Sequence, residues 1–450
     1  MKKLLLLLIT FTALQASAQT TIKQDGAIKR MVDEVSSKNI EATLRKLVSF
    51  KSRHTLSDTT SKTEGSGAAR NWIKAEFEKY ALESQGRLTV QFDTFTQPKS
   101  DRVDKPFHLK NVLATLKGTD PNDTRIYIVS GHYDSRVNDV MNANAVEPGA
   151  NDDASGTAVS MELARVMSKW SFPSTIIFMA VVGEEQGLYG SGNVAKRAKA
   201  EKWNVDAMLN NDIVGNTHGM ENDLKDNRSV RVFSEGVPST AAGNEREIRN
   251  LISQGGENDS PSRELARYVK ETAERYVDQL DVKLIYRRDR YLRGGDHVPF
   301  LQQGFTAVRF TEMNEDFHRQ HQDIRTEKGI DYGDLPDFVD FNYVQKVARM
   351  NLSVLANLAM ASSEPEKVGV VTSDLTNKTT LKWEAPKTGK KPTGYYVLMR
   401  ETTSAYWEKK FYVEGTGLTL DYSKDNYFFA VQSVDEKGHE SLPVYPKPVR

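Results

Sequence analysis

Three short apolar runs in the middle of the chain each end directly before polar residues. They span residues 126–129, 176–182 and 207–209, and helical patterns separate them along the chain. Unbroken apolar runs of this length indicate strands that are buried on both faces, as in parallel sheets. The pattern therefore predicts an α/β fold with a mixed, mainly parallel sheet flanked by helices.

Amphipathic helical patterns surround the predicted strands. Residues 40–48 and 69–77 carry apolar side chains at helical spacing, and residues 154–167 form a further helical stretch between two of the strands. Residues 341–361 form a long amphipathic stretch that closes this part of the chain. We expect these helices to cover the sheet.

The helical periodicity stops at the polar stretch SSEPEKVG, which begins at residue 362. Beyond it, short β-type runs such as TTLKWEAP and GYYVLMRETT alternate with turn signals. This part resembles a fibronectin type III sandwich, in which Trp383 would be a core tryptophan and Tyr427 a tyrosine corner. We therefore predict one domain over residues 19–362 and a small all-β sandwich over residues 363–450, with few core contacts shared between them.

The start of the chain has the pattern of a secretory signal peptide over residues 1–18. Lys2 and Lys3 precede an apolar core, and the sequence ASA ending at Ala18 offers a small-residue cleavage site. The apolar core is too short to span a membrane comfortably. We expect cleavage near Ala18 and export to a periplasm or to the exterior, without a membrane anchor.

Composition and charge narrow the classes of function. Lysine plus arginine and aspartate plus glutamate each number 61, so the formal net charge is zero. This balance gives no global reason to expect nucleic acid or an anionic membrane as a partner. The chain has no cysteine, which excludes disulfides and thiolate metal sites within it.

Side chains that can bind metal follow each of the three predicted strands. His132 and Asp134 follow the first strand, Glu184 and Glu185 the second, and Asp212 the third. Because ligands gather at the carboxyl ends of strands in open α/β sheets, we expect these side chains to share one site. Histidine and carboxylate ligands suit zinc and similar divalent ions.

Local spacing indicates which residues of this site can bind metal and which can support a ligand or transfer a proton. Residues two apart on a strand face the same way, so Asp134 can hold the second ring nitrogen of His132. Asp152 lies in the glycine-rich turn NDDASG ahead of a helix, where a carboxylate can bridge two ions. Glu184 and Glu185 point in different directions beyond a strand end, so one can bind metal while the other takes a proton from a water.

Four motifs in order carry a resemblance to a known family. GHYDS, GANDDASG, GEEQGLYGS and NND resemble the M28 zinc peptidases, which are co-catalytic metallo-aminopeptidases. The resemblance covers roughly residues 49–361. It implies the zinc exopeptidase fold, two Zn²⁺ ions and peptide substrates.

The resemblance also implies a role for each site residue. His132 and Asp212 would bind one ion, and Asp152 would bridge the two ions. Glu185 would bind the other ion, and Glu184 would be the general base.

The last metal ligand of the family is a histidine that is usually followed four residues later by aspartate, and this chain departs from that pattern. In EDFHRQHQDIR, His318 lies five residues before Asp323, and His321 lies two residues before it. We expect His321 to be the ligand because its acidic neighbour can brace it. His318 stays the alternative.

An arginine-rich segment, RRDRYLRGGDHVPF, precedes these histidines. In the resembled family, an Asp-His pair followed by an aromatic residue lies near the substrate pocket, as Asp296, His297 and Phe300 would here. The arginines form either a solvated basic loop or a clamp for an acidic side chain or a terminal carboxylate. They are Arg287, Arg288, Arg290 and Arg293.

These features predict an exported, metal-dependent exopeptidase, and the resemblance favours an aminopeptidase that releases N-terminal residues. A carboxypeptidase that uses the arginines stays open, as does a glutaminyl cyclase, which has a related fold with one zinc. A catalytically silent, metal-containing binding protein is the alternative from another class. The intact pair of Glu184 and Glu185 argues against that alternative.

Overall fold

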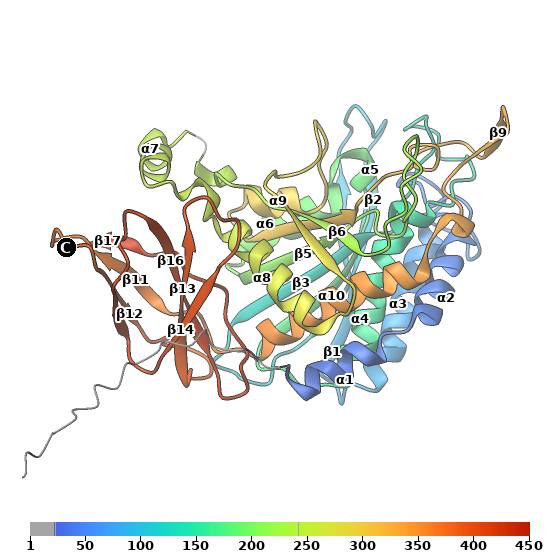
Figure 1. Ribbon diagram of the computed structural model, residues 1–450. Coiled ribbons are helices and arrows are strands. Elements are labelled where there is room, and N and C mark those ends of the chain that lie inside the picture. Colours follow the sequence, from blue (N-terminus) through green and yellow to red (C-terminus); the bar gives the residue numbers. More distant parts are fainter. Residues whose placement is uncertain (1–21, 23, 242) are drawn as a thin grey trace, which may run out of the picture.

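The computed structural model describes residues 22, 24–241 and 243–450 (Figure 1). The signal peptide predicted at residues 1–18 lies outside the described residues. Within the part of the chain that is described, no helix is both long enough and apolar enough to cross a membrane.

An eight-stranded sheet forms the centre of the larger domain. Its strands are β1 (Leu88–Gln97), β2 (Phe107–Leu116), β3 (Arg125–His132), β4 (Thr175–Val181), β5 (Asn204–Asn211), β6 (Ser229–Phe233), β7 (Asp281–Ile285) and β8 (Ala307–Glu312). Their order across the sheet is β1-β2-β4-β3-β5-β8-β6-β7. The central strands β4, β3, β5 and β8 are parallel, whereas β2 and β6 pair with them in the antiparallel sense. The predicted mixed, mainly parallel sheet is confirmed.

Helices cover both faces of this sheet because its central strands are apolar on both sides. In β3, Tyr127 and Val129 belong to one core, and Ile128 belongs to a second core on the other face. The first core also contains residues of α1 (Gly26–Glu34), α2 (Ser37–Val48), α3 (Gly65–Leu82), α4 (Ser155–Met167), α8 (Pro261–Tyr276) and α10 (Phe341–Met360). The second core contains residues of α6 (Tyr189–Ala200) and α9 (His297–Gln302).

The remaining elements of the larger domain are short. Helix α5 (Glu184–Gly187) follows β4 directly, and α7 (Glu245–Ser253) has no buried residue. Strands β9 (Arg325–Glu327) and β10 (Ile330–Tyr332) form a small hairpin that extends from the body (Figure 1).

The C-terminal part forms two small sheets that pack into a sandwich. One sheet has the order β15-β12-β11-β17 and the other β14-β13-β16. The strands are β11 (Glu366–Val371), β12 (Thr379–Glu384), β13 (Gly394–Glu401), β14 (Lys409–Val413), β15 (Gly417–Leu420), β16 (Tyr427–Val434) and β17 (Lys447–Val449). Trp383 lies in the core between the sheets, whereas Tyr427 is half-buried beside Tyr422. The assignment to the fibronectin type III class stays a prediction.

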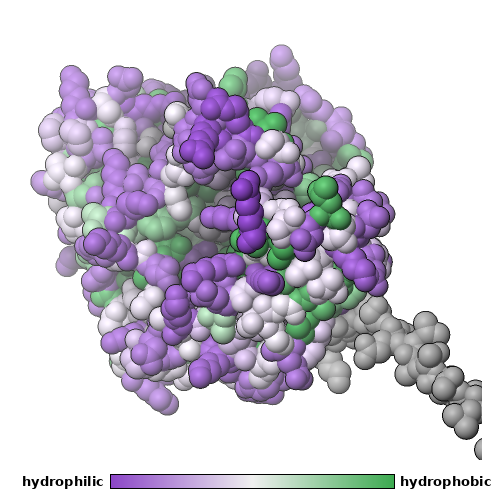
Figure 2. Space-filling model, turned by 90° about the vertical axis from the view of Figure 1, so that its left-hand side faces the viewer, coloured by the Kyte–Doolittle hydropathy of each residue, from purple (hydrophilic) through white to green (hydrophobic). Residues whose placement is uncertain are grey.

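The face of the molecule on the sandwich side is mostly hydrophilic. Apolar residues on this face form small separate groups among polar ones (Figure 2). The apolar side chains of the sandwich are instead gathered around Trp383, where Leu381, Val397 and Val431 are fully buried. The sandwich therefore has a core of its own.

The sandwich nevertheless shares a buried polar interface with the helices of the larger domain. Arg400 of β13 donates to both carboxylate oxygens of Asp259, at 2.8 and 2.9 Å, and both side chains are almost completely buried. Glu440 accepts hydrogen bonds from Arg275 of α8 and from Asn357 of α10. We expected few shared core contacts and did not foresee this polar interface. The polar linker indicated a boundary, but the contacts come from residues far beyond it that fold back against the helices.

Candidate metal centre

Three parallel strands bring their carboxyl ends together at one edge of the central sheet. β3 ends at His132, β5 ends directly before Asp212, and β4 leads to α5, which begins with Glu184 and Glu185. β3 lies between β4 and β5 and is parallel to both. The meeting of these side chains at one end of the sheet follows from that pairing.

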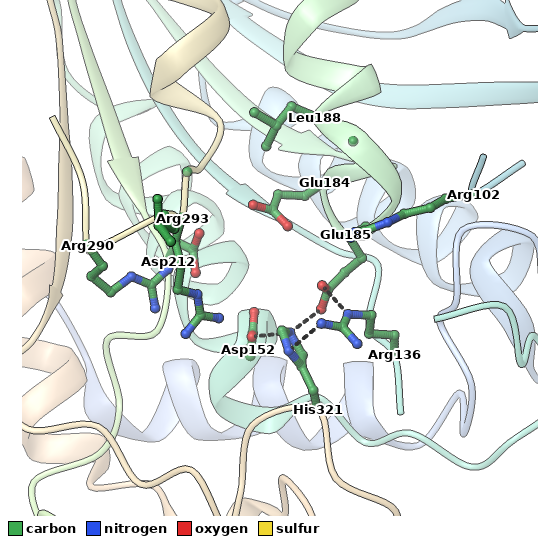
Figure 3. Close-up of a pocket in the computed structure, with 13 residues that line it drawn as sticks. Arg102, Arg136, Asp152, Glu184, Glu185, Leu188, Asp212, Arg290, Arg293 and His321 are labelled. Carbon is green, nitrogen blue, oxygen red and sulfur yellow. Dashed lines mark hydrogen bonds and ion pairs between the residues drawn. The ribbon is translucent and has the colours of Figure 1, made fainter. Parts of the chain in front are cut away.

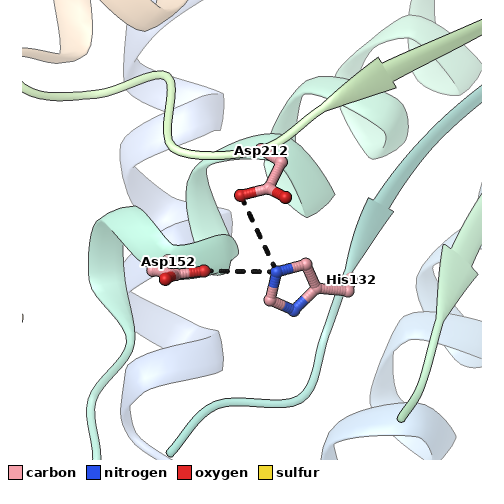
Figure 4. A group of neighbouring side chains, drawn as sticks. All are labelled: His132, Asp152 and Asp212. Atoms are coloured by element: carbon pink, nitrogen blue, oxygen red, sulfur yellow. Dashed lines mark ion pairs between the residues drawn. The ribbon is translucent and has the colours of Figure 1, made fainter. Parts of the chain in front are cut away.

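One group of potential metal ligands consists of His132, Asp152 and Asp212, all of them buried (Figure 4). His132 Nε2 lies 3.2 Å from Asp152 Oδ1 and 4.0 Å from Asp212 Oδ1. This nitrogen is buried and has no hydrogen-bond partner among the described residues. A buried imidazole nitrogen that faces two carboxylates in this way suits a bound cation.

A second group consists of Asp152, Glu185 and His321 (Figure 3). His321 Nε2 lies 2.9 Å from Asp152 Oδ2 and 3.1 Å from Glu185 Oε1. His321 comes from the loop after β8, in a left-handed backbone conformation with φ 55°. A loop residue therefore completes a group whose other members are Asp152, in the turn before α4, and Glu185, in α5.

Asp152 belongs to both groups, and each of its oxygens faces a different histidine. Oδ1 faces His132 and Oδ2 faces His321. A carboxylate whose oxygens are divided in this way is arranged to bridge two ions. The two imidazoles and three carboxylates form a donor set that fits two zinc ions.

The backbone around Asp152 is held by two further carboxylates. Asp334 accepts hydrogen bonds from the backbone N–H groups of Asn151 and Asp152, at 2.9 and 2.7 Å. Asp153 accepts from the backbone N–H of His132, at 2.9 Å. The turn that carries the shared ligand is therefore fixed relative to the end of β3.

Two glycines allow the strand ends and helix α4 to approach closely. A Cβ on Gly131 of β3 would lie 2.3 Å from the backbone of Gly156 in α4. A Cβ on Gly156 would lie 2.2 Å from the carbonyl oxygen of Asn211. Only glycine fits at these positions, which explains the glycine of the NDDASG motif.

Asp134 contacts His132 differently from our expectation. Nδ1 of His132 lies 3.0 Å from the backbone carbonyl oxygen of Asp134, whereas the Asp134 carboxylate oxygen Oδ1 is 3.7 Å away. The carboxylate instead accepts from Thr55 Oγ1, at 2.9 Å, and from the backbone N–H of Glu185, at 3.2 Å. β3 ends at His132, so the alternation of a strand does not extend to Asp134. Its side chain positions the start of α5, and its carbonyl orients the His132 ring.

Glu184 lies beside the metal-ligand groups without joining either. Its Oε2 atom is 4.0 Å from His132 Nε2, and its side chain is 13% exposed. Burial raises the pKa of Glu184, and the nearby carboxylates of Asp212 and Glu185 raise it further. A carboxylate that is close to the ligands and open to the pocket is placed to exchange a proton with a reacting group.

Two arginines outside the predicted motifs contact the ligand carboxylates of Asp212 and Glu185. Arg309 of β8 is fully buried and lies 2.9 Å from Asp212. Arg136 lies 2.9 Å from Glu185. Arg309 could have been noticed, because a charged residue interrupts the apolar strand TAVRF. No comparable signal marks Arg136 or Asp334.

The two candidate histidines of the last motif have different surroundings. The structure brings His321 to the site, whereas His318 packs edge-on against Tyr332, with ring centroids 5.0 Å apart. His318 Nδ1 lies 3.3 Å from Asp316 Oδ1. Of the two, only His321 belongs to a group that could hold a metal ion among the described residues.

The Asp-His pair of the arginine-rich segment lies behind the site. His297 is fully buried with Nε2 2.8 Å from the carbonyl oxygen of Arg288, and burial lowers the pKa of His297 to about 4. Burial also raises the pKa of Asp296 to about 7. Phe300 packs in the second core. These residues support the wall of the site from within.

A pocket of about 300 Å³ opens over the two ligand groups (Figure 3). Asp152, Glu184, Glu185, Asp212 and His321 line it. Four arginines line it as well, and they are Arg102, Arg136, Arg290 and Arg293. The pocket therefore combines an acidic floor with a basic rim.

Comparisons with known sequences identify relatives along most of the chain. The profile of peptidase family M28 matches residues 111–336, a range that includes the residues of both ligand groups. A protein of Leptosphaeria maculans named "Probable zinc metalloprotease" is 48% identical over 422 residues, which cover 94% of this chain and 97% of that protein. Another protein of that name, from Pyricularia oryzae, is 45% identical over 94% of this chain and 85% of its own length.

Solved structures share the fold at lower identity. The LapA aminopeptidase of Legionella pneumophila superposes with a TM-score of 0.53 at 20% identity, over 80% of each chain. A glutaminyl cyclase of Macrostomum lignano superposes with a TM-score of 0.51 at 16% identity, over 75% of this chain and 94% of that one. Together with the motif resemblance and the two ligand groups, the sequence relatives lead to one conclusion: the chain belongs to peptidase family M28.

Proposed function

We propose that this chain is an exported exopeptidase that uses two zinc ions to release N-terminal residues from peptides. The proposal rests mainly on Asp152, whose two carboxylate oxygens face different rings, one that of His132 and the other that of His321. The relatives' printed name, "Probable zinc metalloprotease", supports zinc as the metal. The signal-peptide pattern at residues 1–18 supports export.

Five side chains would hold the ions. His132 and Asp212 would bind one ion, Glu185 and His321 the other, and Asp152 both. When bound, the ions would polarise the carbonyl of the scissile bond and make a nearby water more acidic.

Glu184 moves the proton in this proposal. Its carboxylate accepts a proton from the attacking water and later donates that proton to the nitrogen of the leaving amine. The position of Glu184 supports this role, because its carboxylate lines the pocket and lies 4.0 Å from His132 Nε2 without joining either ligand group.

The carboxylates on the floor of the pocket favour binding of the amino terminus of the substrate over its carboxyl terminus. Asp152, Glu185 and Asp212 would hold the ions, and the carboxylate of Glu184 would remain on the floor to attract an ammonium group. The same fold serves glutaminyl cyclases, so the reaction has to be tested directly.

Short peptides with free or blocked ends test the proposal when their products are identified by mass spectrometry. We expect cleavage of peptides with a free amino terminus, including C-terminally amidated ones, and resistance of N-acetylated ones. Cleavage of acetylated but not of amidated peptides would assign a carboxypeptidase. Loss of ammonia from N-terminal glutamine without cleavage would assign a glutaminyl cyclase.

A further inference from the structure

Arginines line the rim of the pocket on both sides of its carboxylates. Arg102 and Arg136 lie on one side of the acidic floor, and Arg290 and Arg293 lie on the other (Figure 3). The apolar side chains of the lining are limited to two leucines, Leu188 and Leu292. Such a lining offers little apolar surface to a large hydrophobic side chain.

Arg290 and Arg293 share one carboxylate, that of Glu315. Arg290 lies 2.8 Å from Glu315 Oε2, and Arg293 lies 3.7 Å from the same oxygen. Glu315 is already paired with Arg231, at 2.7 Å. Three guanidinium groups thus surround one carboxylate, and a second carboxylate, that of Asp289, contacts Arg290.

Arg293 is the arginine of this group that is most available to a ligand. Its side chain is 35% exposed, against 10% for Arg290. Its ion pair with Glu315 is at the long end of the range, so the guanidinium keeps donors for another acceptor. Asp289 and Glu315 hold Arg290 in place, and its positive charge lies beside that of Arg293.

The other two arginines of the segment turn away from the pocket. Arg287 stacks on Tyr291, with its guanidinium carbon 3.6 Å from the ring centroid. Arg287 and Arg288 line a neighbouring depression instead. The basic segment therefore contains two arginines that line the pocket, Arg290 and Arg293, and two that do not.

We infer that the preferred substrate carries a carboxylate close to its free amino terminus and that Arg293, supported by Arg290, binds this carboxylate. An arginine fork binds a carboxylate with two parallel hydrogen bonds, which gives both attraction and orientation. The inference rests on the proposed function and names the substrate class for the same pocket. The carboxylate has two possible sources, an acidic side chain on the first residue or the terminal carboxylate of a dipeptide.

Two pairs of peptides separate these sources. Glu-Ala-Ala amide against Leu-Ala-Ala amide tests the acidic side chain, and Leu-Ala against Leu-Ala amide tests the terminal carboxylate. In the zinc-loaded full chain, we expect one carboxylate-bearing peptide to exceed its neutral partner in kcat/KM by at least about tenfold, as a charge-assisted hydrogen bond allows.

Arg293→Gln should remove this preference. We expect kcat/KM for the favoured charged peptide to fall about 10–100-fold, while values for the neutral peptides stay unchanged. Arg293→Lys should keep part of the preference, because lysine retains the charge without the fork. Arg287→Gln is the matched control and should behave as the wild-type chain does.

The outcomes separate this inference from the proposed function. Equal cleavage of all peptides, or an equal loss for charged and neutral peptides in Arg293→Gln, overturns the inference and keeps the exopeptidase. If no peptide is cleaved, the proposed function fails, and calorimetric titration of the same peptides into zinc-loaded Glu184→Gln protein decides the inference. Binding of a charged peptide that Arg293→Gln abolishes in that background supports it, and binding that is insensitive to Arg293, or no binding, overturns it.

Discussion

The ion pair between Arg400 of the sandwich and Asp259 beside α8 can be broken with one substitution, Arg400→Met. Arg400 donates to both oxygens of Asp259, and the two side chains are 1% and 0% exposed. Methionine fills much of the same volume but leaves Asp259 with Arg267 as its remaining ion-pair partner, at 3.1 Å. The substitution therefore leaves a buried charge only partly compensated.

The size of the effect follows from this arrangement. Removing one partner of a buried pair costs about 3–5 kcal/mol of unfolding free energy when the other charge is left without compensation. Because Arg267 still contacts Asp259, we expect a loss of about 3 kcal/mol, at the lower end of that range. Adding Asp259→Asn should recover part of the loss, since the double variant no longer buries the charge.

Urea unfolding of the full chain, followed by circular dichroism, measures this loss. Tryptophan fluorescence is a second probe, because Trp407 donates to Glu264 across the same interface, at 2.9 Å. Lys378→Met is the matched control: Lys378 and Asp421 form an ion pair at 2.8 Å, with side chains 60% and 83% exposed. Exposed pairs of this kind contribute little, so this variant should unfold at the wild-type midpoint.

One result would refute the reasoning. If Arg400→Met unfolds at the same urea concentration as the wild-type chain and the control, this ion pair does not stabilise the protein. Removal of the whole sandwich at residue 363 removes Arg400 and Glu440 together, so we expect it to lower the stability of the larger domain.

Three further predictions concern the site. Glu184→Gln should lower turnover at least about 10²–10⁴-fold and keep both ions, whereas Glu185→Gln should lower bound zinc, and measuring turnover and metal together separates the two roles. Chelation should abolish turnover and zinc should restore it; full activity in protein shown by elemental analysis to be metal-free would contradict the metal mechanism. Burial alone would raise the pKa of Glu315, but Arg290 and Arg231 lower it to about 2, below its usual 4.5. The ionised Glu315 therefore stabilises the fold above pH 4.5, and this contribution is lost as the pH falls from 4.5 towards 2. In urea unfolding, the wild-type chain should be more stable than Glu315→Gln above pH 4.5, and this difference should disappear across that interval.

The central strands and the ligands that follow them could be predicted because each signal was local. An apolar run identifies a buried strand, and the polar residues that follow it mark the strand end, as for His132 and Asp212. The parallel pairing then brings these ends together without any further information. The mixed, mainly parallel sheet followed from the same runs.

Other parts of the site depend on contacts between distant residues, and no local signal encodes them. Asp334 holds the turn of Asp152 from more than 180 positions away. Arg136 meets Glu185 because the loop after β3 lies against the start of α5. The contact between the Asp134 carbonyl and His132 was not predicted, because the strand ends two residues earlier than the alternation required. The buried interface of Arg400 was missed for a similar reason. The composition of a linker does not indicate whether residues beyond it fold back against the helices that precede it.

Because Asp152 serves both groups, the two ions of the proposed centre cannot bind independently. An ion between His132 and Asp212 would fix the orientation of Asp152 and so prepare the oxygen that faces His321, while its charge would repel a second ion nearby. Whichever effect prevails, thermodynamic reciprocity requires the second ion to change the affinity of the first by the same factor. A chain with one ion bound therefore has a different affinity for the second ion, and its metal-binding curve would be that of two coupled sites.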